Sequence, residues 1–256
     1  MRTGKTRGKY AKSALKNGLI LQRIKELKSL HPFWGYRRVW AWLRYKEEFN
    51  INHKRVYDLM RKNNLTCKKG NRNKALRLIK PKPKAQRTNQ YFGIDMTKVK
   101  TPTGWVYITI VLDWYTKKVV GYHIGLQSKS RDWISALDMA LNAQFPSGAR
   151  DHDLKLVSDN GCQPTSLAFM KYCCETGVHQ IFTSFCNPKG NAETERFMRT
   201  IKEECCWLQD WDSFDQLQKE IIEWIDFYNN NYLHSALEYK SPAQVEINSN
   251  PLAFSA

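Results

Sequence analysis

The chain has 256 residues, with 41 Lys and Arg against 24 Asp and Glu, and a formal net charge of +17. At 42% hydrophobic and 25% charged residues it has a globular composition, which excludes disordered and collagen-like chains. The sequence contains no run of about 18–20 apolar residues that could span a membrane, and its basic start lacks the apolar run of a secretory signal. Seven cysteines without a C-x-x-C pair indicate neither a disulfide framework nor a zinc site. We therefore expect a cytoplasmic protein of one or two domains with no membrane partner.

The charge is distributed unevenly along the chain. Residues 1–90 hold 26 Lys and Arg and four acids, a net charge of +22, whereas residues 91–256 hold 15 basic and 20 acidic residues, a net charge of −5. Such a basic segment suits nucleic acid or an anionic membrane surface. A soluble basic tail or a ribosome-associated protein fits the charge equally well, so charge alone does not decide the function.

Residues 1–65 are predicted to form a basic helical region. Apolar residues recur at helical spacing over 12–30, and His31-Pro32 ends that helix. A short helix follows over 35–44, and a third opens after Asn52, a predicted N-cap. This order predicts a helix-turn-helix-like DNA-binding region, although an ordinary three-helix bundle fits the same pattern. The basic residues expected to contact DNA here are Arg37, Arg38, Lys54 and Arg55.

Residues 66–90 are predicted to form a basic extended linker. They carry nine Lys and Arg, two prolines and no acid. The Lys-Pro alternation over 80–84 favours an extended, solvated backbone. Lys82 and Lys84 are therefore expected to track a phosphate backbone, while a linker kept soluble by its charge remains an alternative.

From Tyr91 the pattern changes to alternating strands and helices, which predicts an α/β fold. Three strands joined by tight turns form an antiparallel meander, and two further strands alternate with helices. We expect a mixed five-stranded sheet with flanking helices over 91–245 and a C-terminal tail over 246–256. The predicted elements are strands Tyr91–Thr101, Trp105–Asp113, Lys118–Gly125, Leu154–Ser158 and Val178–Thr183, helices Ser130–Phe145 and Ser166–Thr176, a loop Phe185–Gly190, and helices from about Asn191 and from a capping box at Ser213.

Three acids stand out by their positions on these elements. Asp95 lies mid-strand, opposite the apolar face of Phe92 and Ile94. Asp159 follows the carboxyl end of a buried strand, where open sheets place ligand sites. Glu195 lies in the first turns of a helix, where the helix dipole favours an ionised carboxylate.

These three carboxylates suit metal-assisted phosphoryl transfer. Carboxylates brought together from two strands and a helix repel one another unless divalent cations neutralise them. Mg²⁺ prefers hard oxygen ligands, and two ions about 3.5–4 Å apart activate the attacking oxygen and stabilise the leaving one. On the Glu195 helix, Arg199 and Lys202 share a face that would bind DNA phosphates. The opposite face, Phe197, Ile201 and Leu208, is expected to pack on the sheet.

Simpler interpretations fit each acid taken alone. A strand Asp is often solvent-facing, Asp-Asn-Gly is a common turn, and an acid in a first helical turn often only complements the dipole. Two further acids are predicted to be structural. Asp113 is expected to hydrogen-bond the turn near Thr116, and Glu193 projects about 160° away from Glu195 around the helix.

At these residues the chain resembles the transposases of the retroviral-integrase superfamily, which have an RNase H-like fold and an Asp, Asp, 35-residue gap, Glu triad. Here 35 residues lie between Asp159 and Glu195. More narrowly, it looks like the second-frame product of bacterial insertion sequences with two overlapping reading frames. The segments that carry the resemblance are His31-Pro32, Gly35–Arg38, Asn52–Tyr57, Asp95–Thr97, Thr101–Trp105, Ser158–Gly161, Asn191-Ala192 with Glu195, Tyr228-Asn229, His234–Leu237 and Ser241-Pro242.

The resemblance implies a DNA transposase of the DDE type, a magnesium-dependent polynucleotidyl transferase that cleaves DNA and transfers strands to mobilise an insertion sequence. It implies that Asp95, Asp159 and Glu195 ligate two Mg²⁺ ions, which Mn²⁺ would replace, and that Lys202 contacts DNA near the cleaved phosphate. The partners would be double-stranded DNA of the element ends and the target, bound by a homo-oligomer in the nucleoid of a bacterial cell.

Two departures from the family pattern bear on this expectation. In that family a first reading frame supplies a further DNA-binding and oligomerisation segment, and none precedes Met1 here. We therefore expect the chain to need the first-frame product for specific binding of element ends. The zinc-binding His/Cys domain of retroviral integrases is also missing from the sequence, which argues against that branch.

Three alternatives remain at this point. A nuclease of the same fold that hydrolyses RNA in hybrids would use an acid on the first helix after the meander, Asp132 or Asp138. A non-enzymatic DNA-binding regulator would need none of the three carboxylates. An inactive transposase remnant could still have all three carboxylates.

Overall fold

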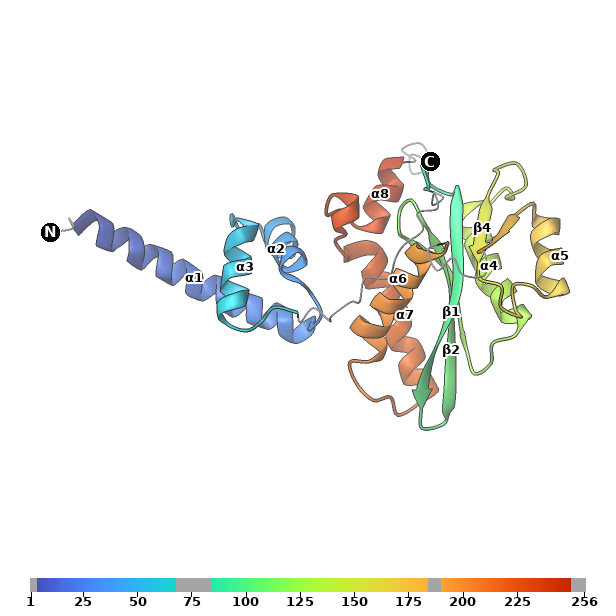
Figure 1. The fold of residues 1–256 in the computed structure, drawn as a ribbon, viewed down its shortest axis with the longest axis horizontal. Coiled ribbons are helices and arrows are strands. Elements are labelled where there is room, and N and C mark those ends of the chain that lie inside the picture. The colour runs from blue at the N-terminus through green and yellow to red at the C-terminus, as the bar shows by residue number, and fades with distance from the viewer. Residues whose placement is uncertain (1–3, 68–83, 184–189, 250–256) are drawn as a thin grey trace, which may run out of the picture. The chain divides into compact units, whose positions relative to one another are not determined.

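The computed structural model describes residues 4–67, 84–183 and 190–249, with the backbone alone over 4–16. By its contacts the chain divides into two compact units. The helical unit comprises the described residues up to 67 together with 233–239, and the sheet unit comprises the described residues of 84–232 and 240–249. Figure 1 shows the ribbon of both units. Lys82 and nearly all of the expected loop at 185–190 lie outside the described residues.

The helical unit contains the three predicted helices, α1 (Gly4–Leu30), α2 (Tyr36–Tyr45) and α3 (His53–Lys62), and the short 3-10 turn η2 (Ser235–Leu237). The first helix begins earlier than expected, at residue 4 rather than 12. The side chain of Asn52 accepts a hydrogen bond from the Lys54 backbone N–H at 2.9 Å, which confirms the predicted N-cap. The described part of this unit has a small apolar core of Ile20, Ile24, Leu27, Trp34, Val39, Leu43, Val56 and Met60, whereas Leu30 at the end of the first helix is exposed.

A charged network joins α1 to the connection after α2. Glu47 accepts hydrogen bonds from Arg23 Nε and Nη2 at 2.9 and 2.7 Å, and from Trp42 Nε1 at 2.9 Å. The Glu47 side chain retains 18% exposure, so its charge is largely removed from water. Bidentate pairing of this kind offsets the desolvation of the carboxylate. The polar stretch after α2 therefore does more than break a helix, because it anchors the first helix.

The sheet unit confirms the predicted α/β fold with a mixed five-stranded sheet. Its strands are β1 (Tyr91–Thr101), β2 (Gly104–Asp113), β3 (Val119–Gly125), β4 (Lys155–Ser158) and β5 (His179–Phe182). They lie in the order β3-β2-β1-β4-β5. The β1–β2 and β2–β3 pairs are antiparallel, and the β1–β4 and β4–β5 pairs are parallel. The central strand β1 therefore joins the meander to the parallel half of the sheet.

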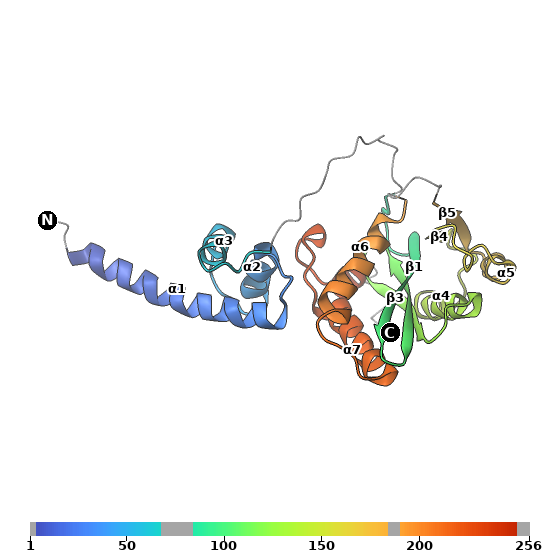
Figure 2. The ribbon, with the colours of Figure 1, turned by 60° about the horizontal axis from the view of Figure 1, so that its bottom comes forward.

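Helices cover both faces of this sheet, as Figures 1 and 2 show. One face carries α4 (Ser130–Gln144) and α5 (Leu167–Thr176). The other carries α6 (Ala192–Ile201), which continues into the π-helical turn η1 (Lys202–Cys206), and α7 (Phe214–Asn231). The amide of Asn229 fixes α7 to the end of β3, donating to Val119 O and accepting from Val119 N at 3.0 and 2.9 Å. None of the described helices is long and apolar enough to cross a membrane.

A last helix, α8 (Pro242–Ser249), was missed by the sequence analysis and crosses the expected boundary between 245 and 246. Its signal was present, because Ser241 and Gln244 form a reciprocal capping box with bonds of 2.9 and 3.4 Å. Glu246 on this helix is 9% exposed, pairs with Lys118 and accepts a hydrogen bond from Gln144. These contacts hold α8 against β3 and α4.

Candidate active site

The two faces of β1 have different roles. Phe92 and Ile94 lie in the apolar core under α4 and α5, and Met96 packs against that core. The alternate residues Gly93 and Asp95 therefore face the other side of the sheet, where α6 lies. This is the orientation that the strand pattern predicted for Asp95, which is half-buried.

The start of α6 is pinned to β1 by a set of contacts that sequence reasoning missed. Asn191 Nδ2 donates to Ile94 O at 3.2 Å, and Trp114 Nε1 donates to Thr194 Oγ1 at 3.0 Å inside the protein. A Cβ at Gly93 would overlap both Thr194 Oγ1 and Trp114 Nε1. Glu195 follows Thr194 directly, so this close approach holds it beside β1. The one signal in the sequence was a glycine inside a strand, which often marks a close approach of another segment.

Asp159 reaches the same region from the neighbouring strand. Gly93 pairs with Val157 in the parallel β1–β4 register, so Asp95 and Asp159 lie two residues further along their chains at the same level. Asp159 Oδ1 accepts a hydrogen bond from Gly161 N at 3.1 Å, and Asn160 Nδ2 donates to Thr183 O at 2.6 Å. The Asp-Asn-Gly segment is thus a turn, and the same turn presents an exposed Asp159 at the strand end.

Electrostatics links the three acids. The pKa of Asp95 is raised to about 6, mainly by burial and further by the negative charges of Asp159 and Glu195. The hydrogen bond from Met96 N and the positive charge of Lys202 act in the opposite direction. The carboxylates therefore lie close enough to one another for their charges to interact. A half-buried carboxyl group whose pKa is raised by two like charges is typical of a functional site.

The donor set fits a divalent cation by its chemistry. Carboxylate oxygens are hard ligands, and a group of three carries the excess negative charge that such an ion neutralises. Among the described residues no group of three His, Cys, Asp or Glu side chains is already close enough to hold a metal ion. Asp95 Oδ1 accepts a hydrogen bond from Met96 N at 2.8 Å, and Asp159 Oδ1 accepts one from Gly161 N at 3.1 Å.

The acids expected to be structural do have structural partners. Asp113 is 1% exposed, and its Oδ2 accepts from Thr116 Oγ1 at 2.8 Å and from Thr88 Oγ1 at 3.1 Å, which confirms the predicted turn contact. Glu193 pairs with Lys117 at 3.0 Å, away from Glu195.

The acids that a hybrid-specific nuclease would need also have other partners. Asp132 Oδ2 accepts from the Lys129 backbone N–H at 2.7 Å at the start of α4. Asp138 accepts from Tyr172 Oη at 2.6 Å. Neither acid contributes to the charge that raises the pKa of Asp95. The structure thus gives no support to a catalytic role for Asp132 or Asp138.

Of the two basic residues expected on the Glu195 helix, Lys202 acts on the pKa of Asp95. Its positive charge lowers the pKa of Asp95. Arg199 donates its Nε to Glu203 Oε1 at 2.7 Å, one turn along the helix. The guanidinium is 63% exposed and remains accessible to a ligand on its other side.

The expected inner face of this helix is correct for Phe197 and Ile201, which are 3% and 0% exposed, but wrong for Leu208, which is 44% exposed. The helix ends in the π-helical turn η1, in which Trp207 N donates to Lys202 O at 2.9 Å. Because Trp207 is the C-cap, Leu208 lies beyond the end of the helix rather than on its inner face. Such turns often lie at functional sites.

The basic residues predicted in the helical unit lie on or beside exposed surfaces. Lys54 is exposed at the start of α3, and Arg55 donates Nε and Nη2 to Asn17 Oδ1 at 2.9 and 2.6 Å. On α2, the Arg37 and Arg38 guanidinium groups lie 5.7 and 5.9 Å from the ring centres of Tyr36 and Trp34. In the sheet unit, Lys84 is exposed before β1.

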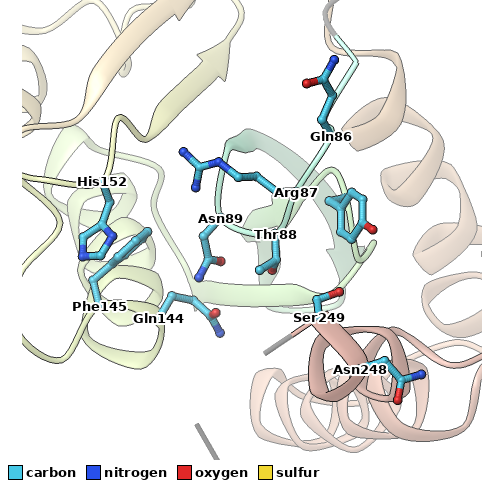
Figure 3. A pocket seen from close by; sticks show the side chains of 10 residues that line it. Gln86, Arg87, Thr88, Asn89, Gln144, Phe145, His152, Asn248 and Ser249 are labelled. Carbon is cyan, nitrogen blue, oxygen red and sulfur yellow. The ribbon is translucent and has the colours of Figure 1, made fainter. Parts of the chain in front are cut away.

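A hollow of about 560 Å³ lies at the other ends of β1 and β4, away from Asp95. Figure 3 shows Arg87 and Asn89, from the segment before β1, between the Phe145–His152 pair on one side and Ser249 of α8 on the other. Its lining residues are polar and aromatic and include no Asp or Glu. This hollow is therefore not a site for the chemistry that the carboxylates suit.

Comparisons with known proteins agree with this arrangement. An HTH-like domain model matches residues 14–74. Two integrase core domain models match residues 85–188 and 176–242. Together these matches cover the helical region and most of the sheet unit.

Curated relatives are bacterial insertion-sequence proteins. The transposase for insertion sequence element IS629 of Shigella sonnei is 29% identical over 63% of this chain and 53% of its own length. The putative transposase InsK for IS150 of Escherichia coli is 27% identical over 82% of this chain and 76% of its own length. The chain thus spans about half the length of the IS629 relative.

A solved structure shows the same fold. A chain of the simian T-cell lymphotropic virus intasome in complex with PP2A regulatory subunit B56 gamma aligns with a TM-score of 0.53 and 14% identity over 86% of this chain and 73% of its own. The integrase core matches over 85–188 and 176–242 and the insertion-sequence relatives show that the chain contains an integrase core and is similar to the transposases of bacterial insertion sequences.

Proposed function

We propose that this chain is a DNA transposase of the integrase superfamily, which cleaves DNA strands and joins them to a target. The observation that supports the proposal is that the charges of Asp159 and Glu195 both raise the pKa of Asp95, and that Asp95 and Asp159 lie at the same level of two neighbouring parallel strands. The insertion-sequence relatives and the integrase core support the same reaction class. In the proposed DDE-type mechanism these three residues are the catalytic carboxylates.

The three carboxylates would hold divalent cations, two Mg²⁺ ions or Mn²⁺ in their place. When bound, such ions stabilise charge on the attacking and leaving oxygens of a phosphodiester. Asp95 must be ionised to act as a ligand, so the site is competent above pH about 6. Lys202 lies on the same side and would bind the phosphate that is cut.

The reaction has two steps of the same chemistry. Water attacks the phosphorus at the element end in line, the P–O3′ bond breaks, and the freed 3′-oxygen takes up a proton. That 3′-hydroxyl then attacks a phosphodiester of the target, forming a new P–O bond while the P–O3′ bond of the target breaks. The contribution of the chain is to orient the strand and to position the carboxylates from two strands and α6.

The helical unit would bind double-stranded DNA of the element ends. Its α3 has the place of a recognition helix, and the residues at the start of such a helix contact bases in the major groove. Lys54 and Arg55 are at that start, while Arg37 and Arg38 on α2 would contact phosphates. Lys82 and Lys84 in the segment before β1 would add phosphate contacts.

Transposition joins two element ends, so we propose that the chain acts as a homo-oligomer on DNA. The narrower resemblance to a second-frame product makes the first-frame product of the same element a proposed partner. For the domain boundaries we propose 1–65, 66–90, 91–245 and 246–256, with the boundary at 245 now seen to fall within α8.

The test is strand joining on a branched DNA that mimics a strand-transfer product, in Mg²⁺ or Mn²⁺. Transesterification exchanges one phosphodiester for another, so the reverse reaction on this substrate reports the same site without requiring a known element end. Asp159→Asn and Glu195→Gln should each reduce joining at least about a thousandfold. Glu193→Gln is the matched control on the same helix and should keep wild-type activity.

Retained joining by Asp159→Asn would reject the assigned triad. A wild-type chain that binds DNA but joins no strands, with or without an added first-frame product, would favour a non-enzymatic regulator or an inactive remnant. Loss of joining in Glu193→Gln equal to that in Glu195→Gln would show that general damage to α6, rather than the lost carboxylate, explains the result.

A further inference from the structure

A groove of about 810 Å³ lies along the second half of β1 and begins at Thr97, two residues from Asp95. Residues 97–100 of β1 and Trp105 line one side, and Lys202 with residues 206–211 line the other. In the described part of the chain β4 pairs with β1 only over 91–93, so no strand covers this edge of β1 further along. Figure 1 shows the tip of the β1–β2 hairpin and the α6–α7 connection at the same end of the sheet unit.

Two tryptophans expose their rings at this groove. Trp105 is 42% and Trp207 62% exposed, and they are the two exposed tryptophans of the part of the chain that the structure describes. Tryptophan is a large side chain that proteins usually cover. Exposed apolar groups gathered at a groove mark a binding site. Neither ring was explained by the fold or by the proposed reaction.

The groove is also positively charged. The ammonium groups of Lys98 and Lys100 lie 4.4 and 5.4 Å from the ring centre of Trp105. By strand alternation these two lysines and Trp105, which pairs with Lys100, lie on the face of β1 opposite Asp95. On the Asp95 side the Lys202 ammonium lies 5.8 Å from the ring centre of Trp207, so the groove takes cations from both faces at the free edge of β1. Asp210 is the one acid among the described lining residues. Aromatic faces beside cations are the usual combination for single-stranded nucleic acid, because bases stack and phosphates pair with the cations.

The position of the groove gives it a direction. Thr97 lies two residues beyond Asp95 on the same strand, and Lys202 belongs both to the groove and to the surroundings of the carboxylates. The six residues from Asp95 to Lys100 are separated by five steps and span about 17 Å of extended strand. That length matches about five stacked nucleotides at roughly 3.4 Å each.

We propose that this groove binds an unpaired DNA strand that leads away from the scissile phosphate. Bases stack on Trp105 and Trp207, and Lys98, Lys100 and Lys202 bind the phosphates. This proposal rests on the proposed function, because that function places the scissile phosphate at the carboxylates from which the strand leads away. A paired duplex buries its base faces and leaves the rings unused, so the groove selects DNA that is frayed or cut near the active site. The net positive charge favours a DNA strand over a peptide strand added to the free edge of β1.

The experiment measures binding of the full chain to two labelled DNAs in metal-free buffer, where no cleavage occurs. One is a duplex with a single unpaired arm of about eight nucleotides, within the site sizes of single-strand binders. The other is the same duplex with blunt ends. The ratio of the two dissociation constants reports the preference for an unpaired strand, independently of how the helical unit binds the duplex.

The wild type should prefer the forked DNA, and Trp105→Ala and Trp207→Ala should each reduce that preference about tenfold. Trp105→Phe keeps a stacking ring and should retain most of it. Lys98→Gln with Lys100→Gln, an exposed pair whose loss does not threaten the fold, should weaken fork binding and lower its salt dependence by about 0.7 per lost contact. Lys171→Gln on α5, whose side chain is 75% exposed, is the matched charge control and should bind as the wild type does.

Unchanged fork preference in the Trp105→Ala, Trp207→Ala double variant would overturn the proposal. If this double variant binds forked DNA as the wild type does but sediments differently, the proposal is also overturned. The groove would then be assigned to binding a strand of another protein chain. The two proposals fail separately, because fork binding needs no metal. Asp159→Asn should lose joining and keep the fork preference. If the wild type joins no DNA but the tryptophan variants still lose the preference for forked DNA, the result supports strand binding in the groove and rejects the proposed transposase reaction.

Discussion

The helical and sheet units use charged side chains in opposite ways. In the helical unit the partly buried acid, Glu47, lies against Arg23, and the opposite charges join two segments of the chain. In the sheet unit the half-buried acid, Asp95, lies near two further acids that raise its pKa. Paired opposite charges need no function to explain them, whereas a gathering of like charges costs stability until a ligand neutralises it. The comparison therefore separates a structural carboxylate from a candidate catalytic one without any knowledge of the reaction.

The largest effect is expected from a glycine substitution in the sheet unit. Gly93→Ala places a methyl group against Thr194 and Trp114, so α6 must move off β1 and carry Glu195 with it. We expect strand joining to fall at least about a hundredfold, with a loss of stability of about 1–3 kcal/mol, measured by the joining assay and by urea unfolding.

The matched change in the helical unit is Gly35→Ala, because the space around Gly35 is open and its φ is −74°. It should leave joining unchanged and cost less than about 1 kcal/mol. Equal losses from the two substitutions would contradict the role assigned to the contact between α6 and β1.

Next comes the charged network of the helical unit. Glu47→Gln removes the carboxylate that accepts from Arg23 and should cost about 1–3 kcal/mol of stability, measured by unfolding of the whole chain. Glu26→Gln removes the other partner of the same arginine, an exposed pair with 38% and 46% side-chain exposure, and should leave the stability close to that of the wild type because solvent screens the pair. A cost for Glu26→Gln as large as that for Glu47→Gln would remove the distinction between them.

Binding of Mg²⁺ at the site of Asp95, Asp159 and Glu195 should depend on pH. Since the folded-state pKa of Asp95 is raised to about 6, the carboxyl is ionised at pH 7.5 and protonated progressively below pH 6. A proton and a metal ion compete for it, so Mg²⁺ affinity should fall about tenfold for each pH unit below 6. The rise in Tm on adding Mg²⁺, recorded from pH 5 to 8, measures this. A rise that is independent of pH would argue against Asp95 as a ligand.

The smallest effect is expected on the DNA-binding face of the helical unit. Lys54→Gln and Arg55→Gln should each weaken binding of duplex DNA a few-fold and reduce the slope of log affinity against log salt by about 0.9. Lys25→Gln on α1 makes the same charge change on an exposed site of the same unit. If Lys25→Gln reduces the affinity for duplex DNA by the same amount, the effect depends on net charge rather than on the position of Lys54 and Arg55 on α3.

Much of the fold could be predicted because its signals are local. The strand Tyr91–Thr101 was predicted with the bounds that β1 has, and Asn52 was identified as an N-cap from one residue. The turn contact of Asp113 with Thr116 was likewise a matter of three residues. The helix α8 was also predictable, because Ser241 and Gln244 form a capping box that is visible in the sequence, but the sequence analysis missed it.

Other features could not be predicted because they depend on residues far apart in the chain. The hydrogen bond between Trp114 and Thr194 joins positions 80 residues apart. The π-helical turn at Lys202–Cys206, after which Leu208 is exposed against expectation, depends on how α6 meets the sheet rather than on any residue type within it. The groove with Trp105 and Trp207 exists only where a hairpin and a distant helix end meet.

Residue order alone determined the basic helical region, the mixed sheet and the three acids at positions 95, 159 and 195, because hydrophobic period, turn residues and caps act over a few neighbours. Only the tertiary structure decided that those acids share one electrostatic environment, that a glycine lets α6 approach β1, and that two tryptophans border a basic groove. The physical reason is that distances between remote segments are set by packing, which no local pattern encodes.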